Sequence, residues 1–245
     1  MLLREVDRRT GLSSAVAKAL HDPRDPELIT HALRDLVAQR LYGLCCGYED
    51  LNDHTTLRSD PLMQTAVGTG EALGSSATLC RMERQARRVD VVALNRVLID
   101  QFIAAQTVAP KELILDIDAS DIPLHGEQEH AEFNAYYDHY CYLPLYVFCG
   151  KAMLACVLRN SRIDGAKHAA AVIKLLVTRL RQVWPKVRII VRGDSGFCRQ
   201  RLIRWCERSA VGYVIGVARN ARLHRIVAPW EARMGKRYAK TKTKQ

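Results

Sequence analysis

The chain has 245 residues with 37 Lys and Arg against 26 Asp and Glu, a formal net charge of +11, and this length suffices for one large or two modest domains. Charged residues interrupt every apolar run well before the roughly 20 residues of a membrane-spanning helix, and the charged start MLLREVDRR excludes a secretory signal. We therefore expect a cytoplasmic protein without a membrane partner, whose eight cysteines, none in a CxxC pattern, are mostly reduced thiols of the core.

The first hundred or so residues have the apolar spacing of helices. In ELITHALRDLVAQRLYGLCCGYED, apolar residues recur every three or four positions from Leu28 to Leu44. This spacing predicts one amphipathic helix that ends near Gly47. The segment SSATLCRMERQARRVDVVALNRVLIDQFIAAQ is typical of a single long helix. It would crowd four arginines onto one face, where they could contact phosphates or simply be solvated: Arg81, Arg84, Arg87 and Arg88.

After Pro110 the pattern changes to short apolar runs. ELILDIDASD, CYLPLYVFCG and AMLACVLR predict three strands in an antiparallel meander. GAKHAAAVIKLLVTRLRQVW predicts an amphipathic helix that ends at Pro185, followed by a strand in KVRIIVRGDSGF, a helix in RQRLIRWCER and a strand in GYVIGVAR. The predicted fold is α/β, with the order β-β-β-α-β-α-β.

Acidic residues lie where two of these strands end. Asp116 and Asp118 are two positions apart on the first strand and therefore share a face. Asp194 follows the fourth strand, in a turn with Gly193 and Gly196. The first and fourth strands can be neighbours, which would bring Asp118 and Asp194 together. A divalent cation would offset the repulsion between two carboxylates, and oxygen ligands select Mg²⁺ or Mn²⁺. The alternative is that these residues only end a strand and form a turn.

Positive charge is concentrated at the carboxyl end. Residues 197–245 hold 13 Lys and Arg against 2 Asp and Glu, a net charge of +11 that equals the excess of the whole chain. Such a segment favours a polyanion as partner, because each neutralised phosphate releases counterions. Arg199 and Arg201, at its start, are further candidates for DNA contacts. The last residues, RYAKTKTKQ, are also compatible with a solvated or disordered tail.

Several motifs in order resemble a known family. LDIDASDIPLHGEQE, FNAYYDHY, LPLYVF, IIVRGDSGFCRQRLIRWCE and YVIGVARN, with RDPELITHALRDLVAQRLYGLCCGYEDLNDHTTLRSDP before them, are similar to DDE transposases of the insertion-sequence-1380 family. The resemblance implies a ribonuclease-H-like core whose first two catalytic, metal-binding acids match Asp118 and Asp194. Asp116 competes for the first position, but Ala119 and Ser120 are the small and hydroxyl residues that follow the family's first acid.

The resemblance also implies what the chain does and where it departs from the family. Members perform Mg²⁺- or Mn²⁺-dependent strand cleavage and transfer at element ends, and use a third acid, a Glu, further along. Nothing here matches that Glu; Glu231 is the only acidic residue after Glu207, so we expect a truncated form. We expect a helical DNA-binding region over residues 1–109, an incomplete catalytic core over 110–220 and a basic segment over 221–245. Partners would be duplex DNA at element ends and either a second copy or a full-length transposase. The alternatives are a catalytically silent DNA-binding remnant and a stand-alone nuclease of the same fold.

Overall fold

The computed structural model describes residues Met1–Lys242. The chain forms two compact units, one of Met1–Pro110 with Lys151–Cys156 and one that starts with Lys111–Gly150 and resumes at Val157. Throughout the described residues, no helix combines the length and the apolar character that crossing a membrane requires. The eight cysteines are free thiols, but only Cys141 and Cys206 are buried, so the expectation that most of them lie in the core is wrong.

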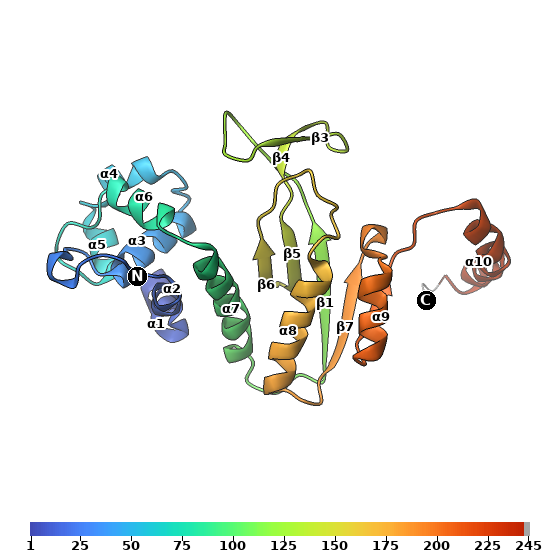
Figure 1. The fold of residues 1–245 in the computed structure, drawn as a ribbon. Helices are drawn as coiled ribbons and strands as arrows, with labels where there is room; N and C mark the ends of the chain where they lie inside the picture. Colours follow the sequence, from blue (N-terminus) through green and yellow to red (C-terminus); the bar gives the residue numbers. More distant parts are fainter. Residues whose placement is uncertain (243–245) are drawn as a thin grey trace. The chain divides into compact units, whose positions relative to one another are not determined.

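The first unit is built from short helices (Figure 1). Its core joins Ala38 and Tyr42 to Met63, Val67 and Leu73. The elements are α1 (Leu2–Thr10), α2 (Leu12–Ala19), η1 (Pro26–Leu28), α3 (Leu33–Cys45), η2 (Leu51–Asp53), α4 (His54–Leu57), α5 (Pro61–Val67), α6 (Ser76–Arg84) and α7 (Arg88–Ala104).

The helix predicted from Leu28 onwards is wrong at its start. Asp25 caps the short η1, its carboxylate accepts a hydrogen bond from the Glu27 amide, and the chain turns again before α3 begins at Leu33. Leu28 is 80% exposed and lies outside the buried stripe, whereas Leu36 and Val37 are 2% exposed. The local capping hydrogen bond outweighs the apolar periodicity here.

The single long helix predicted over Ser76–Gln106 is also wrong, because the chain breaks between α6 and α7. Arg87 is the N-cap of α7: its amide donates to the Asp90 carboxylate at 2.7 Å, and its guanidinium pairs with the same side chain. Asp90 is 3% exposed, which fixes this cap in the packed interior. The four arginines around the break therefore do not share one helical face.

The mixed sheet expected from the sequence consists of four strands of the second unit and of β6 (Ala152–Val157), most of which is grouped with the first unit. Its strand order is β6-β5-β1-β7-β8, with β5 antiparallel to β1, and with β7 parallel to both β1 and β8. When only the five strands of this sheet are numbered along the chain, their order in the sheet is 3-2-1-4-5, which is a ribonuclease-H-like arrangement. The elements are β1 (Glu112–Ala119), β5 (Leu145–Cys149), β6 (Ala152–Val157), α8 (Ala169–Val183), β7 (Arg188–Gly193), α9 (Gln200–Arg208) and β8 (Gly212–Ile215).

One face of the sheet is buried and the other is open. Leu113, Leu115 and Ile117 alternate along β1 on the buried face, which α8 crosses (Figure 1). The helix contributes Ile173 and Leu180, both fully buried. A slip of one residue in the strand register would turn every core side chain of β1 to the open face. Each Å² of apolar surface returned to water would cost about 25 cal/mol, so the alternation fixes the register.

A second, small sheet was not predicted. It consists of β2 (Ile122–Pro123), β3 (Glu132–Asn134) and β4 (His139–Tyr142) in the order β2-β4-β3, with antiparallel pairs. Its strands have two to four residues, too short to give a period in the sequence.

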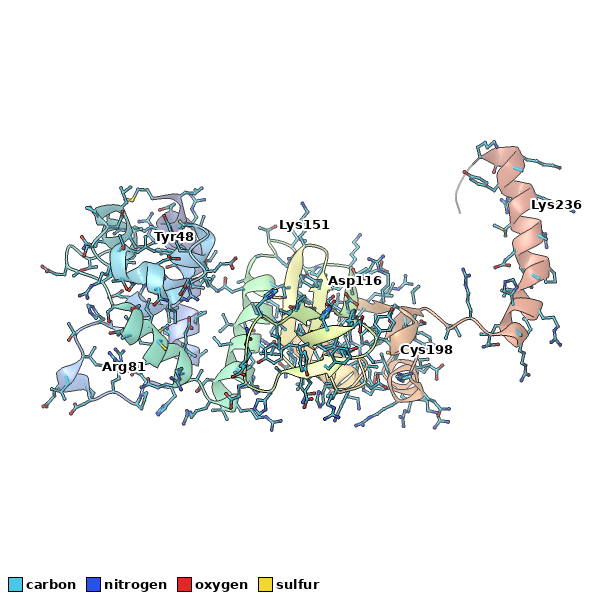
Figure 2. The ribbon with its side chains drawn as sticks, turned by 90° about the horizontal axis from the view of Figure 1, so that it is seen from above. Tyr48, Arg81, Asp116, Lys151, Cys198 and Lys236 are labelled. Carbon is cyan, nitrogen blue, oxygen red and sulfur yellow. The ribbon has the colours of Figure 1, made fainter. Side chains whose placement is uncertain are left out.

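The basic segment forms a helix, α10 (Ala221–Thr241), so the disordered tail considered from Arg237 onwards is wrong up to Thr241. The last residues of that tail, 243–245, lie outside the described residues. Asn220 caps α10 by accepting a hydrogen bond from the Leu223 amide at 2.9 Å. None of its described residues is buried; Lys236 marks the helix in Figure 2.

Candidate functional site

The acidic residues of β1 lie on the open face of the sheet. Because side chains alternate along a strand, Asp116 and Asp118 point away from the buried Leu115 and Ile117. Asp116 is half-buried and Asp118 is exposed. The shared face was predicted from their spacing.

Asp116 is engaged by a cation on the neighbouring strand. In the parallel ladder it is the partner of Arg192 on β7, whose Nε and Nη2 bind the two carboxylate oxygens, the latter at 2.8 Å. This pairing raises the pKa of the Arg192 guanidinium. A bidentate pair uses both oxygens of Asp116. This favours Asp118 over Asp116 as the residue free to bind another group.

Asp118 and Asp194 follow the last ladder pair of β1 and β7 by the same number of positions. The ladder pairs Asp116 with Arg192; Asp118 follows two positions later on β1, and Asp194 follows two positions later in the turn after β7. Strands in a sheet lie about 4.8 Å apart. Both residues are exposed, at the strand ends where open α/β sheets commonly bind ligands. Their assignment as catalytic metal ligands remains a prediction.

Each of these two carboxylates is held by one hydrogen bond at one oxygen. Ser120 donates its hydroxyl to Oδ2 of Asp118 at 2.8 Å, and the Gly196 amide donates to Oδ1 of Asp194 at 2.9 Å. The turn after β7 leaves little room around it. A Cβ at Gly216 would lie 2.9 Å from the Ser195 amide nitrogen and 3.2 Å from the Asp194 carbonyl carbon.

The small sheet and its connecting turn bring His139 and Tyr137 close to acidic residues near the end of β1. Nε2 of His139 lies 2.8 Å from Oδ2 of Asp121. Burial, and then the charges of Asp121 and Asp118 among others, raise the pKa of Tyr137. Sequence reasoning missed His139 and Tyr137; the motif FNAYYDHY contains both, but only the fold brings them towards the acids.

The two exposed carboxylates are chemically suited to a hard divalent cation. Asp118 and Asp194 each keep one oxygen that carries no hydrogen bond among the described residues, and carboxylate oxygens are the ligands that Mg²⁺ and Mn²⁺ prefer. Within Met1–Lys242, however, no group of three or more His, Cys, Asp or Glu side chains could hold a metal ion. Asp118 and Asp194 therefore stay predicted ligands, and the described residues offer no group of three such side chains around a metal ion.

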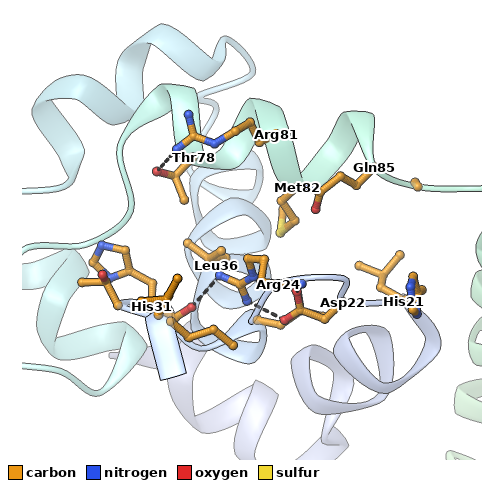
Figure 3. A pocket seen from close by; sticks show the side chains of 15 residues that line it. His21, Asp22, Arg24, His31, Leu36, Thr78, Arg81, Met82 and Gln85 are labelled. Atoms are coloured by element: carbon orange, nitrogen blue, oxygen red, sulfur yellow. Dashed lines mark hydrogen bonds and ion pairs between the residues drawn. The ribbon is translucent and has the colours of Figure 1, made fainter. Parts of the chain in front are cut away.

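The arginines proposed to contact DNA have different environments. Arg81 donates to the Thr78 hydroxyl at 3.1 Å and lines a cavity of about 420 Å³ in the first unit (Figure 3). Arg87 is used in the α7 cap, and Arg199 pairs with Asp164 at 2.8 Å. All six are exposed, including the remaining three: Arg84, Arg88 and Arg201.

The cavity of Figure 3 combines aliphatic walls with a closed ion pair. Leu36 and Met82 contribute to its lining, together with Arg24, whose guanidinium is bound by both oxygens of Asp22 at 2.6 and 2.7 Å. The pairing lowers the pKa of the Asp22 carboxyl. Because Asp22 neutralises the charge of Arg24, the cavity offers less positive charge than the basic residues that line it suggest.

Solved structures of transposases resemble the chain at low identity. The catalytic domain of the Mos1 mariner transposase is 12% identical with a TM-score of 0.32, over 62% of this chain and 71% of that one. A piggyBac transposase synaptic complex with hairpin DNA is 16% identical with a TM-score of 0.35, over 90% of this chain and 50% of that one. The Drosophila P element transposase strand transfer complex is 14% identical with a TM-score of 0.29, and the chain spans 40% of its length.

No curated protein matches the chain in sequence. A family profile does, and it covers residues 1–245. That profile describes the transposase DDE domain, group 1. The DDE class was inferred above from the two strand-end acids and the motifs around them, and the match over the full length agrees with that inference. The chain therefore belongs to the group 1 family of transposase DDE domains.

Proposed function

We propose that this chain is the DNA-processing part of an insertion-sequence transposase, of the kind represented by the insertion-sequence-1380 family, and that Asp118 and Asp194 are its metal ligands. The observation that supports the proposal is the parallel register of β1 and β7, in which Asp116 pairs with Arg192 two positions before Asp118 and Asp194 respectively. The family match supports transposition as the process.

A bound Mg²⁺ or Mn²⁺ supplies Lewis acidity for in-line phosphoryl transfer. The chain's own residues hold and orient the ligands. Ser120 fixes one oxygen of Asp118, and the Gly196 amide fixes one oxygen of Asp194. Each carboxylate thereby presents its other oxygen. Arg192 neutralises Asp116 and lowers the negative charge close to the site.

Duplex DNA at element ends is the proposed substrate. Six basic residues and one acidic residue lie on α10, which exposes them all. Exposed Lys and Arg bind phosphates with little dependence on sequence. We assign residues 1–109 to DNA binding, 110–220 to the catalytic core and 221–245 to a basic segment that follows the backbone of the duplex. A second copy or a full-length transposase would complete the assembly.

A catalytically silent DNA-binding protein is the second candidate. It is favoured by the lack of a third carboxylate beside Asp118 and Asp194 within Met1–Lys242. A protein of this kind would occupy element ends without cutting them.

Metal binding and DNA binding, measured separately, test the proposal. Mn²⁺ titration followed by electron paramagnetic resonance should detect binding that Asp118→Ala and Asp194→Ala each remove. Binding to labelled duplex should persist in both variants, because phosphate contacts by arginines do not need the metal. Metal binding that is unaffected by either substitution would refute the site. Failure to bind any duplex would refute the proposed role in transposition.

A further inference from the structure

One charged side chain of the second unit is almost completely buried. Arg159 is 6% exposed, although an arginine withdrawn from water normally requires a carboxylate beside it. Its guanidinium instead donates to three backbone carbonyls: Nε to Leu143 at 2.8 Å, and Nη1 to Gly165 at 3.1 Å and to Lys167 at 2.7 Å. Nη2 is buried without a partner among the described residues. Burial lowers the pKa of this guanidinium.

Arg159 joins two segments that flank the carboxyl end of β1. Leu143 lies two residues before Leu145, which pairs with Ala119 in the ladder between β5 and β1. Gly165 lies in the segment ahead of α8, and a Cβ at this position would be 3.6 Å from the Cβ of Ala119. Ala119 directly follows Asp118. The hydrogen bonds of Arg159 therefore hold the segment 158–168 against the residue next to the first acid.

The same segment also reaches the turn that carries the second acid. Oδ1 of Asp164 accepts a hydrogen bond from the Ala166 amide at 2.8 Å, and Oδ2 pairs with Nη2 of Arg199 at 2.8 Å. The Ala166 amide and then Arg199 lower the pKa of the Asp164 carboxyl. Arg199 is the N-cap position of α9 and lies five residues after Asp194.

From these contacts we infer that Arg159 is a positioning residue, which makes the segment 158–168 a brace between Asp118 on β1 and Asp194 after β7. Asp164 and Arg199 form the end of the brace at β7. Burying a guanidinium without a directly bonded carboxylate costs folding free energy. The hydrogen bonds of Arg159 are directed at the backbone that supports Asp118 and Asp194. The inference rests on the proposed metal-binding function of those acids.

The test compares Arg159→Lys with a control in the same segment. Lysine keeps the positive charge but has one nitrogen, so it cannot bind all three carbonyls. Arg162→Lys is the control, since Arg162 has a 73% exposed side chain and pairs only at the surface with Glu132. Mn²⁺ affinity is measured by electron paramagnetic resonance on the full chain, and folding is checked by circular dichroism.

We expect folded Arg159→Lys to bind Mn²⁺ about tenfold or more weakly, the usual effect of losing a residue that supports metal ligands, and Arg162→Lys to bind as the wild type does. Wild-type affinity in Arg159→Lys would overturn the inference. If Arg159→Lys does not fold, Asp164→Asn decides, because the Asp164 side chain is 52% exposed and the substitution removes its charge while keeping its size. It should weaken Mn²⁺ binding, and unchanged affinity would overturn the brace. If instead Asp118→Ala binds Mn²⁺ like the wild type, the proposed function itself has failed.

Discussion

Arg192 on β7 binds both carboxylate oxygens of Asp116 on β1, and the two residues are direct partners in the parallel ladder. This pair separates two aspartates that look equivalent in the sequence. Asp116 is neutralised within the sheet, whereas Asp118 lies beyond the pair, towards Asp194. Which of the two aspartates binds the metal can therefore be tested by making the same substitution at each position.

Asp118→Asn should abolish Mn²⁺ binding, while Asp116→Asn should retain it, because only Asp118 has an unpaired carboxylate oxygen towards the strand end. Loss of the Asp116–Arg192 pair should change the free energy of unfolding by less than about 1 kcal/mol, since the Arg192 side chain is 58% exposed. Mn²⁺ titration and urea unfolding of both variants measure this. The reverse order of metal affinities would make Asp116 the ligand.

Gly216→Ala should destabilise the chain by about 1–3 kcal/mol, the cost of forcing atoms into a packed site, and weaken Mn²⁺ binding. Its Cβ would meet backbone atoms of Ser195 and Asp194, which cannot move without shifting the turn that presents the second acid. Gly235→Ala on α10 is the matched control. Its Cβ would meet nothing within 4 Å, and it should stabilise the helix by about 0.5–1 kcal/mol. Equal effects of the two substitutions on metal affinity would contradict this reasoning.

The first unit should lose stability in mild acid through His54. This side chain is fully buried beside Gln39, and burial lowers its pKa below the ordinary value of 6.5. The unfolded chain then binds a proton before the folded one does. The contribution of His54 is fully present above about pH 6.5 and is lost as the pH falls below it, at no more than about 1.4 kcal/mol per pH unit.

Urea unfolding at several pH values between about 7.5 and 5 tests this prediction, a range around the ordinary pKa of histidine. The free energy of unfolding of the wild type should fall more steeply with acid than that of His54→Gln, whose side chain does not titrate. Parallel pH profiles of the two proteins would show that the buried imidazole is not responsible.

The sequence predicted the large sheet because its strands and helices have strong periods. The alternation of Leu113, Leu115 and Ile117 and the stripe on α8 each bury one face, so pattern and fold agree. The predicted helix start at Leu28 and the predicted continuous helix through Arg87 were wrong because capping hydrogen bonds decide both boundaries. The carboxylates of Asp25 and Asp90 accept these hydrogen bonds from backbone amides. Such local bonds compete with periodicity and leave no period of their own.

For the candidate site, the sequence predicted the acids but not their surroundings. Asp118 lies near the end of one recognisable strand and Asp194 follows another, and the prediction that they lie close together depends only on strand order. Arg192, His139 and Arg159 act through contacts between distant segments, 76 residues apart for Arg192 and Asp116. Nothing in the neighbouring sequence of Arg159 distinguishes it from the exposed Arg162, and only burial does.

DNA binding should weaken steeply as salt increases, because exposed arginines and lysines of α10 would contact phosphates rather than bases. Replacing Arg225 and Lys236 with Gln should reduce both the affinity for duplex DNA and the slope of log affinity against log salt, the slope by about 1 for each phosphate that is no longer neutralised. Fluorescence anisotropy at two or more salt concentrations measures this. Affinity that does not depend on salt would exclude the proposed phosphate contacts.

The purified chain should not cut or join DNA at a useful rate with Mg²⁺ or Mn²⁺. Two ions held roughly 4 Å apart need carboxylates on both sides of the scissile phosphate, and the described part of the chain has no group of three His, Cys, Asp or Glu side chains placed to hold a metal ion. A missing ligand that costs about 4 kcal/mol of transition-state stabilisation lowers the rate about a thousandfold. Glu231, exposed on α10, is the acidic side chain that could restore activity if it reached the two aspartates.

The assay is metal-dependent nicking of labelled duplex that carries element ends, with Asp118→Ala, Asp194→Ala and Glu231→Gln as controls. Cleavage that both Asp variants abolish would prove the site complete, and its loss in Glu231→Gln would identify the third ligand.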